Sequence, residues 1–398
     1  MRILIVEEAL EDGNGHWPAY IGCLAQGFRE RGDSVDVLVH YQASAEVLER
    51  VGGIAWLRRN CWRDPSSQGG WGGVRHALSH ASDLRRWLQD HPGYDWILCP
   101  TMRLQHLLAV AMGLPWMTSP PCRWLLLFVQ GFGVYDGRQR PMRFPKSPSL
   151  WLARGCFRLL RRACSRGQVV VAAETPAMQA ELQDFASVAV SLMPHPVAPP
   201  ANLGERIPSS ADEPSITLCC PGFARYEKGS DLLADAVALL RQEPSPLPIT
   251  FILQWPHPFR LPDGAEATPP VDGADGPHIE LINHGLNEKE YESLLQRSDF
   301  VILPYRASSY HNRLSRVAIE AASCGIPLIY SAGTWTEELA SMSGGGTAIV
   351  DESPAAIVQA VRSAIAHRSS CSAAARSGAA RVAQFHSVDA FRECLSRA

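Results

Sequence analysis

The sequence predicts an α/β protein made of two Rossmann-like domains. Short apolar runs of strand length alternate with helical patterns through both halves of the chain, which is typical of parallel sheets. The chain has 398 residues, more than one ordinary core accommodates. A Pro- and Ser-rich stretch without periodicity separates the halves. We therefore expect one domain over residues 1–198, a linker over 199–214, a second domain over 215–381 and a terminal helix over 382–398.

The composition is that of a globular protein. Hydrophobic residues make up 46% of the chain and charged residues 19%. The net charge of −3 gives no general argument for nucleic acid, so we expect no nucleic-acid partner. No apolar run is long enough to span a bilayer, and the N-terminus lacks the pattern of a signal peptide. The adjacent Cys219 and Cys220 fit core thiols in a reducing compartment, so we expect a cytoplasmic protein.

The first half opens with a strand, a Gly-rich turn, a helix and a second strand. We assign the strands to Arg2–Val6 and Ser34–Val39 and the helix to Pro18–Arg31. The glycines do not form G-x-G-x-x-G and no acidic residue follows the second strand, so the pattern does not favour a dinucleotide. Gly13 and Gly15 either make a plain tight turn or bring the backbone close to a ligand.

The remaining elements alternate in the same way. In the first half we expect strands at Trp96–Cys99, Trp124–Gln130, Val169–Ala172 and Ala189–Met193, and helices at Gly73–Asp90, Arg103–Met112 and from Thr175-Pro176. In the second half we expect strands at Ser215–Cys220, Ile249–Gln254, Ile279–Asn283, Phe300–Leu303, Pro327–Tyr330 and Ala348–Val350, and helices at Gly229–Arg241, Glu288–Arg297 and Ser315–Cys324.

The segment Arg138–Arg166 carries arginine and lysine but no acidic residue. Its second half interleaves the arginines with apolar residues such as Trp151 and Phe157, close to the pattern of a basic amphipathic helix. Such a helix either contacts an anionic membrane or substrate, or is an ordinary solvated surface helix. In the first case the protein is peripheral at the inner face of the membrane.

Two loops in the second half carry candidate binding residues. Arg225 and Lys228 lie between the first strand of this half and the helix that follows it. Two cations beside the unpaired N–H groups of a helix start suit a diphosphate. In the stretch 299–331, a polar loop follows another buried strand and opens a helix that holds Glu320 among small residues. Because open α/β sheets bind ligands at the carboxyl ends of their strands, we expect a pocket there.

These stretches resemble the GT-B glycosyltransferases, specifically the large retaining family 4 group. The likeness rests on F-A-R-Y-E-K-G-S-D-L-L at 223–233, I-E-A-A-S-C-G-I-P-L-I at 319–329, H-G-L-N-E-K-E-Y-E-S-L-L-Q-R-S-D-F-V-I-L-P-Y at 284–305, S-L-M-P-H-P-V at 191–197 and G-N-G-H-W-P-A-Y at 13–20. The resemblance implies two Rossmann-like domains facing across a cleft. It places the acceptor on the first domain and the nucleotide sugar on the second, and it implies a C-terminal helix that crosses back to the first domain.

The resemblance implies roles for the matching residues of the second domain. Glu320 accepts hydrogen bonds from the ribose hydroxyls of the donor. Lys228 and Arg225 are catalytic, since they hold the diphosphate and stabilise the charge that develops on it as the glycosidic bond breaks. Ser315 offers N–H groups at a helix start to the same phosphates. The loop His284–Leu286 flanks the base, with His284 and Leu286 as contacts.

In the first domain, the resemblance places Gly15 and His16 on the acceptor side of the cleft. His16 is a catalytic candidate, and a histidine packed at a turn is the alternative. At three positions the chain departs from the family. Asn312 stands where most members carry the first of two glutamates, and the surrounding Y-H-N-R-L-S resembles a variant in which Arg313 and Ser315 help to bind phosphate.

Two further departures concern charge and acid–base chemistry. The usual arginine directly after the strand-end glycine is replaced by Phe223, so Arg225 must reach from two residues later. Gln130 stands where many members have a histidine. A glutamine cannot act as acid or base at neutral pH, but it can hydrogen-bond a sugar or a phosphate.

The resemblance implies a glycosyltransferase of the hexosyltransferase type that retains the anomeric configuration. Its donor is a nucleotide diphosphate sugar, its acceptor is a glycan, a lipid-linked sugar or a small molecule, and no cofactor is bound. The chain contains no Asp-x-Asp triplet, so we expect transfer without a metal. One alternative is a nucleotide-sugar epimerase of the GT-B fold, which should present several acid–base residues around the sugar. Another is an inactive GT-B subunit that binds a partner.

Overall fold

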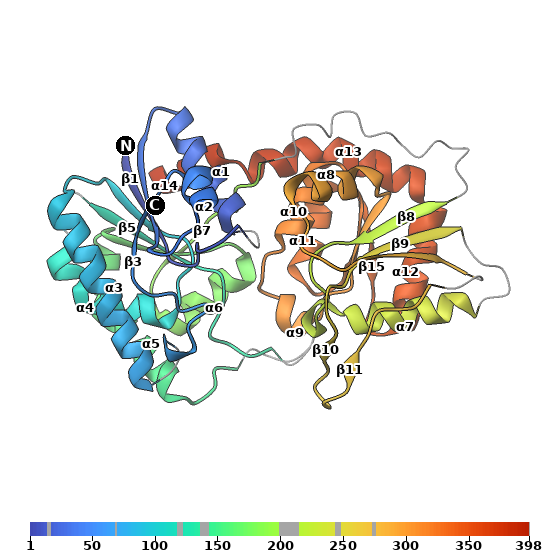
Figure 1. Cartoon of the computed structure of the whole chain (residues 1–398), viewed down its shortest axis with the longest axis horizontal. Coiled ribbons are helices and arrows are strands. Elements are labelled where there is room, and N and C mark those ends of the chain that lie inside the picture. The colour runs from blue at the N-terminus through green and yellow to red at the C-terminus, as the bar shows by residue number, and fades with distance from the viewer. Residues whose placement is uncertain are drawn as a thin grey trace. The chain divides into compact units, whose positions relative to one another are not determined.

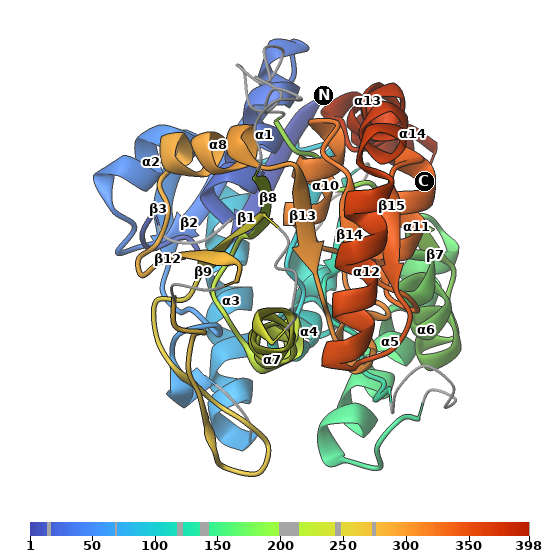
Figure 2. The ribbon, with the colours of Figure 1, turned by 90° about the vertical axis from the view of Figure 1, so that its right-hand side faces the viewer.

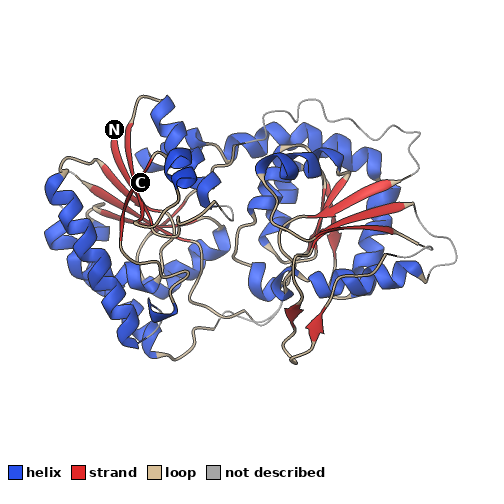
Figure 3. Ribbon diagram, viewed as in Figure 1, coloured by secondary structure: helices blue, strands red, loops and turns tan. Residues whose placement is uncertain are grey.

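The protein consists of two compact α/β units. The computed structural model describes residues 1–13, 17–67, 70–117, 122–135, 143–198, 215–242, 248–272 and 276–397. The first unit comprises Met1–Val134, Met142–Pro196 and Ser387–Ala398, and the second comprises Tyr135–Pro141 and Val197–His386. Each unit has a sheet with helices on both faces (Figure 1, Figure 3). The expected linker, 199–214, lies outside the described residues.

The sheet of the first unit has seven strands in the order β3-β2-β1-β4-β5-β6-β7, all parallel. The strands are β1 (Arg2–Glu7), β2 (Ser34–His40), β3 (Gly53–Leu57), β4 (Trp96–Cys99), β5 (Arg123–Phe128), β6 (Val169–Ala173) and β7 (Val190–Leu192). Strands β4 and β6 are buried along their whole length, which is why they appear in the sequence as continuous apolar runs.

Helices cover both faces of this sheet. They are α1 (Trp17–Glu30), α2 (Ala45–Val51), α3 (Gly70–Asp90), α4 (Leu104–Met117), α5 (Pro148–Ser165), α6 (Pro176–Ala186) and α14 (Val388–Arg397), with a short 3-10 turn at Pro65–Ser67. One core lies between the sheet and α3 to α6, and the other between the sheet and α1, α2 and α14. Ser147 and Thr175 cap α5 and α6, and a proline follows each cap.

The C-terminal helix α14 belongs to the first unit. Phe391 packs edge-on against Phe28 of α1, with ring centroids 6.2 Å apart. Arg392 contacts the buried Asp33 with an Nε–Oδ2 distance of 3.0 Å, and the same carboxylate holds the N-terminal ammonium group at 2.6 Å. Hydrophobic packing and a buried carboxylate therefore fix the end of the chain to α1 and the turn that follows it.

The sheet of the second unit has six parallel strands in the order β12-β9-β8-β13-β14-β15. The strands are β8 (Ile216–Cys220), β9 (Ile249–Gln254), β12 (His278–Ile282), β13 (Phe300–Leu303), β14 (Leu328–Ser331) and β15 (Gly346–Ile349). A small antiparallel hairpin of β10 (Phe259–Arg260) and β11 (Glu266–Ala267) lies outside this sheet.

The helices of the second unit are α7 (Ser230–Arg241), α8 (Glu288–Arg297), α9 (Ala307–Tyr310), α10 (Arg316–Ser323), α11 (Trp335–Ser343), α12 (Pro354–Ala366) and α13 (Arg368–Phe385), with a 3-10 turn at Tyr226–Lys228. One core lies under α7 and α12, and the other under α8, α10, α11 and α13. Figure 2 shows α12 running along β14 and β15.

Both sheets have the same strand order, and it reverses at a defined point. In each unit the first three strands of the main sheet are added toward one edge, and the later strands are added toward the opposite edge. The reversal therefore lies between β1 and β4 in the first unit and between β8 and β13 in the second. Ligands of open α/β sheets bind outside the carboxyl ends of the strands at such a point. The strand order therefore marks one candidate position in each unit.

The structure corrects several sequence-based boundaries. The expected helix over 382–398 is divided, because α13 extends to Phe385 and α14 begins at Val388. Several elements were not predicted: α2, β3, α9, α11, α12 and most of α13. The strand expected at Trp124–Gln130 ends at Phe128, so Gln130 lies in the loop beyond it.

Two helical glycines give a prediction for stability. A Cβ atom at Gly378 of α13 would lie 1.9 Å from the carbonyl oxygen of Ser343, so we expect Gly378→Ala to destabilise the protein by about 3 kcal/mol or more. Gly155 of α5 has no atom within 4 Å of such a Cβ. There the same change removes only a helix-breaking residue and should stabilise by about 0.5–1 kcal/mol. Thermal unfolding of both variants checks this; shifts of the same sign would contradict it.

Candidate functional site

The predicted binding residues of the second unit lie in three loops at one edge of its sheet. Arg225 and Lys228 follow β8, His284 and Leu286 follow β12, and the loop 304–315 follows β13. All three strands are parallel, so their carboxyl ends meet at the same edge. The loops after β8 and β13 flank the point at which the strand order reverses, and the loop after β12 lies at the same edge of the sheet.

Lys228 is the most unusual charged residue at this edge. It is mostly buried at the end of the 3-10 turn, and burial lowers the pKa of its ammonium group to about 8. The loop makes room for it with a glycine: a Cβ at Gly222, where φ is +85°, would lie 2.4 Å from Nζ of Lys228. A cation that is removed from solvent in this way favours an anionic ligand.

The start of α7 is fixed against β13 by close backbone approach. Gly229 has φ of +64°, and a Cβ there would lie 1.9 Å from the carbonyl oxygen of Pro304. Ser230 Oγ accepts a hydrogen bond from the Arg225 N–H group at 3.1 Å, which holds the turn that carries Lys228. The side chain of Arg225 is 59% exposed, and its Nη1 lies 3.7 Å from Glu227. Arg225 is therefore an exposed cation and Lys228 a partly buried one.

Glu320 on α10 is buried and already holds two partners. The Tyr291 hydroxyl donates to Oε2 at 2.8 Å, and Nε of Arg316 donates to Oε1 at 2.7 Å. A carboxylate offers about four acceptor positions, so two remain for further donors. The pKa of Tyr291 is raised by its burial and by the carboxylate beside it. Arg316 lies one helical turn before Glu320, a spacing visible in the sequence, whereas Tyr291 comes from α8.

The loop before α10 is ordered by its own side chains. Ser315 is the N-cap of α10: its Oγ accepts from the Ala318 N–H group at 3.3 Å and lies 3.2 Å from the Tyr305 hydroxyl. The Ser315 side chain is thus used for capping, and an anion at this helix start would meet backbone N–H groups. Asn312 is buried and Arg313 partly exposed in the same loop.

Gln254, which the sequence analysis did not single out, joins two of the loops. Its side chain is buried at the end of β9; Oε1 accepts from the Gly222 N–H group at 2.6 Å, and Nε2 donates to the His284 carbonyl at 2.9 Å. The His284 ring is exposed, with Nε2 3.4 Å from Glu290. Leu286 packs against the core beneath α10. Only the strand pairing of β9 could have indicated Gln254.

Arg306 was also missed, and it supports the loop that follows β13. Its guanidinium group forms an ion pair with Asp231 of α7, lies 3.8 Å from Glu352 and stacks 3.9 Å above the ring of Tyr226. These contacts connect three segments around the end of β13. We assign Arg306 a supporting role, because its charge is already matched by two carboxylates.

The predicted residues of the first unit are less fully described. Gly15 and His16 lie outside the described residues. Gln130 lines a hollow of about 220 Å³ beside β5, together with Arg103 and Gln105. Arg103 donates to the Cys61 carbonyl at 3.1 Å and stacks over the Trp62 ring at 4.2 Å. The hollow is thus polar on one side and contains a fixed cation.

The described part of the basic segment is the helix α5. Its buried face includes Phe157, while Trp151 and Leu159 are 71% and 69% exposed. The arginines of the exposed face are Arg154, Arg158, Arg161 and Arg162. Arg138 and Arg140 lie outside the described residues. Within the described ranges, no helix is long and apolar enough to cross a bilayer.

Comparison with known proteins gives a match for the second unit. Residues 215–367 match the family described as Glycosyl transferases group 1. This range contains every predicted binding residue of the second unit. The second unit is therefore similar to this family over most of its length. A comparison with curated proteins finds no significant relative.

Solved structures resemble the whole chain. A sucrose-phosphate synthase from Thermosynechococcus elongatus is 15% identical with a TM-score of 0.64, covering 100% of this chain and 98% of that one. HepE of Anabaena, solved with UDP and glucose, is 13% identical with a TM-score of 0.61 over 100% and 98% of the two chains. A putative UDP-N-acetylglucosamine 2-epimerase from Listeria monocytogenes is 11% identical with a TM-score of 0.55 over 96% and 94%. The fold is GT-B, as the sequence predicted.

Proposed function

We propose that the protein is a glycosyltransferase that moves a sugar from a nucleotide diphosphate sugar to an acceptor, with retention and without a metal at the donor site. One observation carries the proposal. Lys228 lies partly buried beside the start of α7, at the point where the strand order of the unit that matches glycosyl transferases group 1 reverses. The two neighbours solved as complexes of HepE with UDP and with UDP-glucose support a nucleotide-sugar donor.

The residue roles form part of this proposal. Lys228 and Arg225 hold the diphosphate, and the N–H groups at the start of α10 beside Ser315 and Arg313 bind its oxygens. Glu320 accepts the ribose hydroxyls through the acceptor positions that Tyr291 and Arg316 leave open. The loop His284–Leu286, held by Gln254, flanks the base.

In retaining transfer the protein needs no strong general base, because the leaving phosphate takes the proton of the acceptor. Electrostatic stabilisation of the leaving diphosphate is then the main contribution of the protein. This fits a donor site in which a partly buried lysine, an exposed arginine and the N–H groups of a helix start can face the diphosphate. On the acceptor side we propose that Gln130 hydrogen-bonds the sugar or a phosphate, and that Gly15 and His16 contact the acceptor.

Turnover with a nucleotide diphosphate sugar tests the reaction. We expect release of the nucleoside diphosphate, equal rates with and without added magnesium, and a product whose anomeric proton has the coupling of the donor sugar in an NMR spectrum. A product of opposite configuration would contradict retention, and strict dependence on magnesium would contradict metal-free transfer.

The resemblance to a putative UDP-N-acetylglucosamine 2-epimerase makes epimerisation the second candidate. The two functions differ in what remains after the reaction. An epimerase converts the donor sugar in the absence of any acceptor, whereas the transferase requires an acceptor. Incorporation of solvent deuterium into the donor sugar without an acceptor would favour the epimerase.

We expect Glu320→Gln to weaken binding of the nucleoside diphosphate by about 10- to 100-fold, since the amide offers fewer acceptor positions and no charge to match Arg316. Calorimetric titration measures this loss. Glu337→Gln is the control. Glu337 is an exposed residue of α11 whose Oε2 accepts a hydrogen bond from the Gly333 N–H group at 2.7 Å, and its replacement should leave the affinity for the nucleoside diphosphate unchanged. Equal affinity of wild type and Glu320→Gln would show that the ribose is bound elsewhere.

We further propose that α5 contacts an anionic membrane surface, which fits a lipid-linked acceptor. Exposed Trp151 and Leu159 lie among arginines, and each arginine near such a surface contributes about 1 kcal/mol. Reversing the charge of Arg158, Arg161 and Arg162 to glutamate should therefore weaken binding to phosphatidylserine vesicles on the order of 100-fold or more. Vesicle co-sedimentation measures the change.

A charge-matched control separates the α5 surface from net charge. Reversal of the exposed Arg85, Arg260 and Arg362 changes the net charge by the same amount and should preserve most of the binding. Equal loss in both triple variants, or unchanged binding in the α5 variant, would contradict a specific contact through α5.

A further inference from the structure

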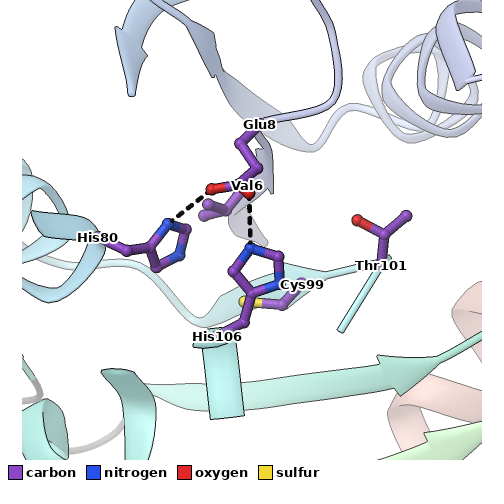
Figure 4. Close-up of a pocket in the computed structure, with 6 residues that line it drawn as sticks. All are labelled: Val6, Glu8, His80, Cys99, Thr101 and His106. Atoms are coloured by element: carbon purple, nitrogen blue, oxygen red, sulfur yellow. Dashed lines mark ion pairs between the residues drawn. The ribbon is translucent and has the colours of Figure 1, made fainter. Parts of the chain in front are cut away.

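The first unit contains a buried cluster of one carboxylate and three imidazoles. Glu8 follows β1, His76 and His80 lie one turn apart on α3, and His106 lies on α4. One ligand atom of each lies within 4.8 Å of the others, and all four residues are buried. Figure 4 shows the rings of His80 and His106 directed at the two oxygens of Glu8. Three elements that are distant in sequence thus converge on one carboxylate.

The distances in the cluster are those of atoms that share a ligand or a proton. Oε2 of Glu8 lies 3.0 Å from Nε2 of His76 and 3.3 Å from Nδ1 of His80. Oε1 lies 3.0 Å from Nε2 of His106. A tetrahedral ion with bonds of about 2.0–2.1 Å separates its ligand atoms by about 3.3 Å, so small movements would open this cluster around an ion.

A small cavity adjoins the cluster. Its volume of about 10 Å³ is close to the smallest that can hold one water molecule. It is lined by Val6, Glu8, His80, Cys99, Thr101 and His106 (Figure 4). The cavity lies at the carboxyl ends of β1 and β4, where the strand order of the first sheet reverses. The cavity therefore places space for an ion beside a set of oxygen and nitrogen ligands.

We propose that Glu8, His76, His80 and His106 bind one zinc ion. Imidazole nitrogen and carboxylate oxygen are zinc ligands, and four protein ligands in a buried position are typical of a closed, structural site. The ion would satisfy the inward-facing atoms of three buried imidazoles at once. Because the ligands come from the turn after β1, from α3 and from α4, the ion would hold two helices to the edge of the sheet. All four ligands belong to the first unit, and none is among the residues proposed for the donor site.

The metal-free alternative is a carboxylate saturated by hydrogen bonds. In that state Glu8 accepts from all three imidazoles and from the Cys61 N–H group at 2.6 Å, and Nδ1 of His106 accepts from the Arg103 N–H group at 3.2 Å. An ion on Nε2 of His106 puts the ring proton on Nδ1, so the contact with Arg103 is given up. The two states differ in metal content, which an experiment measures directly.

The first experiment uses the full-length wild-type protein. It is incubated with zinc sulfate, dialysed, and analysed for metal by mass spectrometry; we expect about one zinc ion per chain. Replacement by Co²⁺ should give the intense visible absorption of a tetrahedral site, and treatment with EDTA should lower Tm. These readouts are independent of enzymatic activity.

Variants assign the ion to the cluster. The double variant His76→Gln/His80→Gln keeps the approximate volume of the side chains and should lose the zinc. The matched control, His257→Gln/His278→Gln, removes two exposed imidazoles of the second unit and should keep it. Circular dichroism of each variant reports whether it is folded.

Each outcome decides the proposal. Stoichiometric zinc that is lost only in the cluster variant supports it. A wild-type protein that keeps no zinc after dialysis, and whose Tm is unchanged by zinc and by EDTA, overturns it in favour of the hydrogen-bonded carboxylate. Zinc retained by a folded cluster variant also overturns it. If the cluster variant does not fold, the Co²⁺ spectrum of the wild type decides: tetrahedral absorption supports the site, and its absence overturns it.

Discussion

We expect the Lys228→Met variant to bind the nucleoside diphosphate on the order of 100-fold more weakly than wild type, because a buried cation at an anion site is lost. The same variant should unfold at a higher temperature. Burial lowers the pKa of Lys228 from 10.5 to about 8, so the folded state is penalised for holding the charge. The full shift corresponds to about 3 kcal/mol, and we expect about 1–3 kcal/mol because the side chain is partly exposed.

The sign of the pH dependence follows from the lowered pKa. Between pH 8 and 10.5 the unfolded chain holds a proton on Lys228 that the folded chain has lost, so this group makes stability rise with pH across that window. Below pH 8 the penalty is fully present. Binding has the opposite trend: affinity for the diphosphate should fall as the pH rises above about 8, since the free protein loses the charge.

Thermal unfolding and calorimetric titration at several pH values measure both effects. Lys289→Met, which removes an exposed lysine of α8, is the matched control and should change neither quantity. Lower stability together with unchanged affinity in Lys228→Met would show that Lys228 serves the fold and not a ligand.

The second large effect is expected for Gly229→Ala. A Cβ at this position would lie 1.9 Å from the carbonyl oxygen of Pro304, so either the end of β13 or the start of α7 must move. We expect a loss of about 3 kcal/mol or more in unfolding free energy, together with weaker donor binding. Both the close contact and the positive φ of +64° oppose an alanine.

Gly264 separates these two causes. Its φ is +90°, but no atom lies within 4 Å of its Cβ position, so Gly264→Ala tests backbone strain alone. It should cost about 1 kcal/mol and leave donor binding unchanged. Thermal unfolding of the two variants compares them. An equal fall in Tm would show that the contact with Pro304 is unimportant.

The two-domain α/β architecture was predictable because buried parallel strands have short, continuous apolar sequences. The position of Lys228 between the end of β8 and the start of a helix was predictable for the same reason. Two kinds of element escaped prediction. Helix α13 is rich in alanine and serine and lacks a clear apolar stripe, and α2 is short, although Ser44 and Gly52 provide caps at its two ends.

The contacts within the site were less predictable than its position. Glu320 was identified, but its hydrogen bond from Tyr291 joins α8 to α10 and depends on how the helices pack. Gln254 connects two loops only because β9 lies between β8 and β12 in the sheet. The cluster around Glu8 draws residues from three elements, and only the spacing of His76 and His80 was available in the sequence. Local patterns therefore predict where a site lies, whereas the contacts of its residues depend on tertiary packing.

The most direct test of the donor site is thermal unfolding with UDP, GDP, ADP, TDP and CMP, each with and without magnesium. A ligand at about 100 times its dissociation constant adds about 2.7 kcal/mol to the stability of the native state. We predict that one nucleoside diphosphate raises the Tm of the wild type equally with and without magnesium, and that the rise for Lys228→Met at the same concentration is much smaller. A wild-type Tm unchanged by every nucleotide would contradict a donor site at Lys228 and favour an inactive, partner-binding subunit.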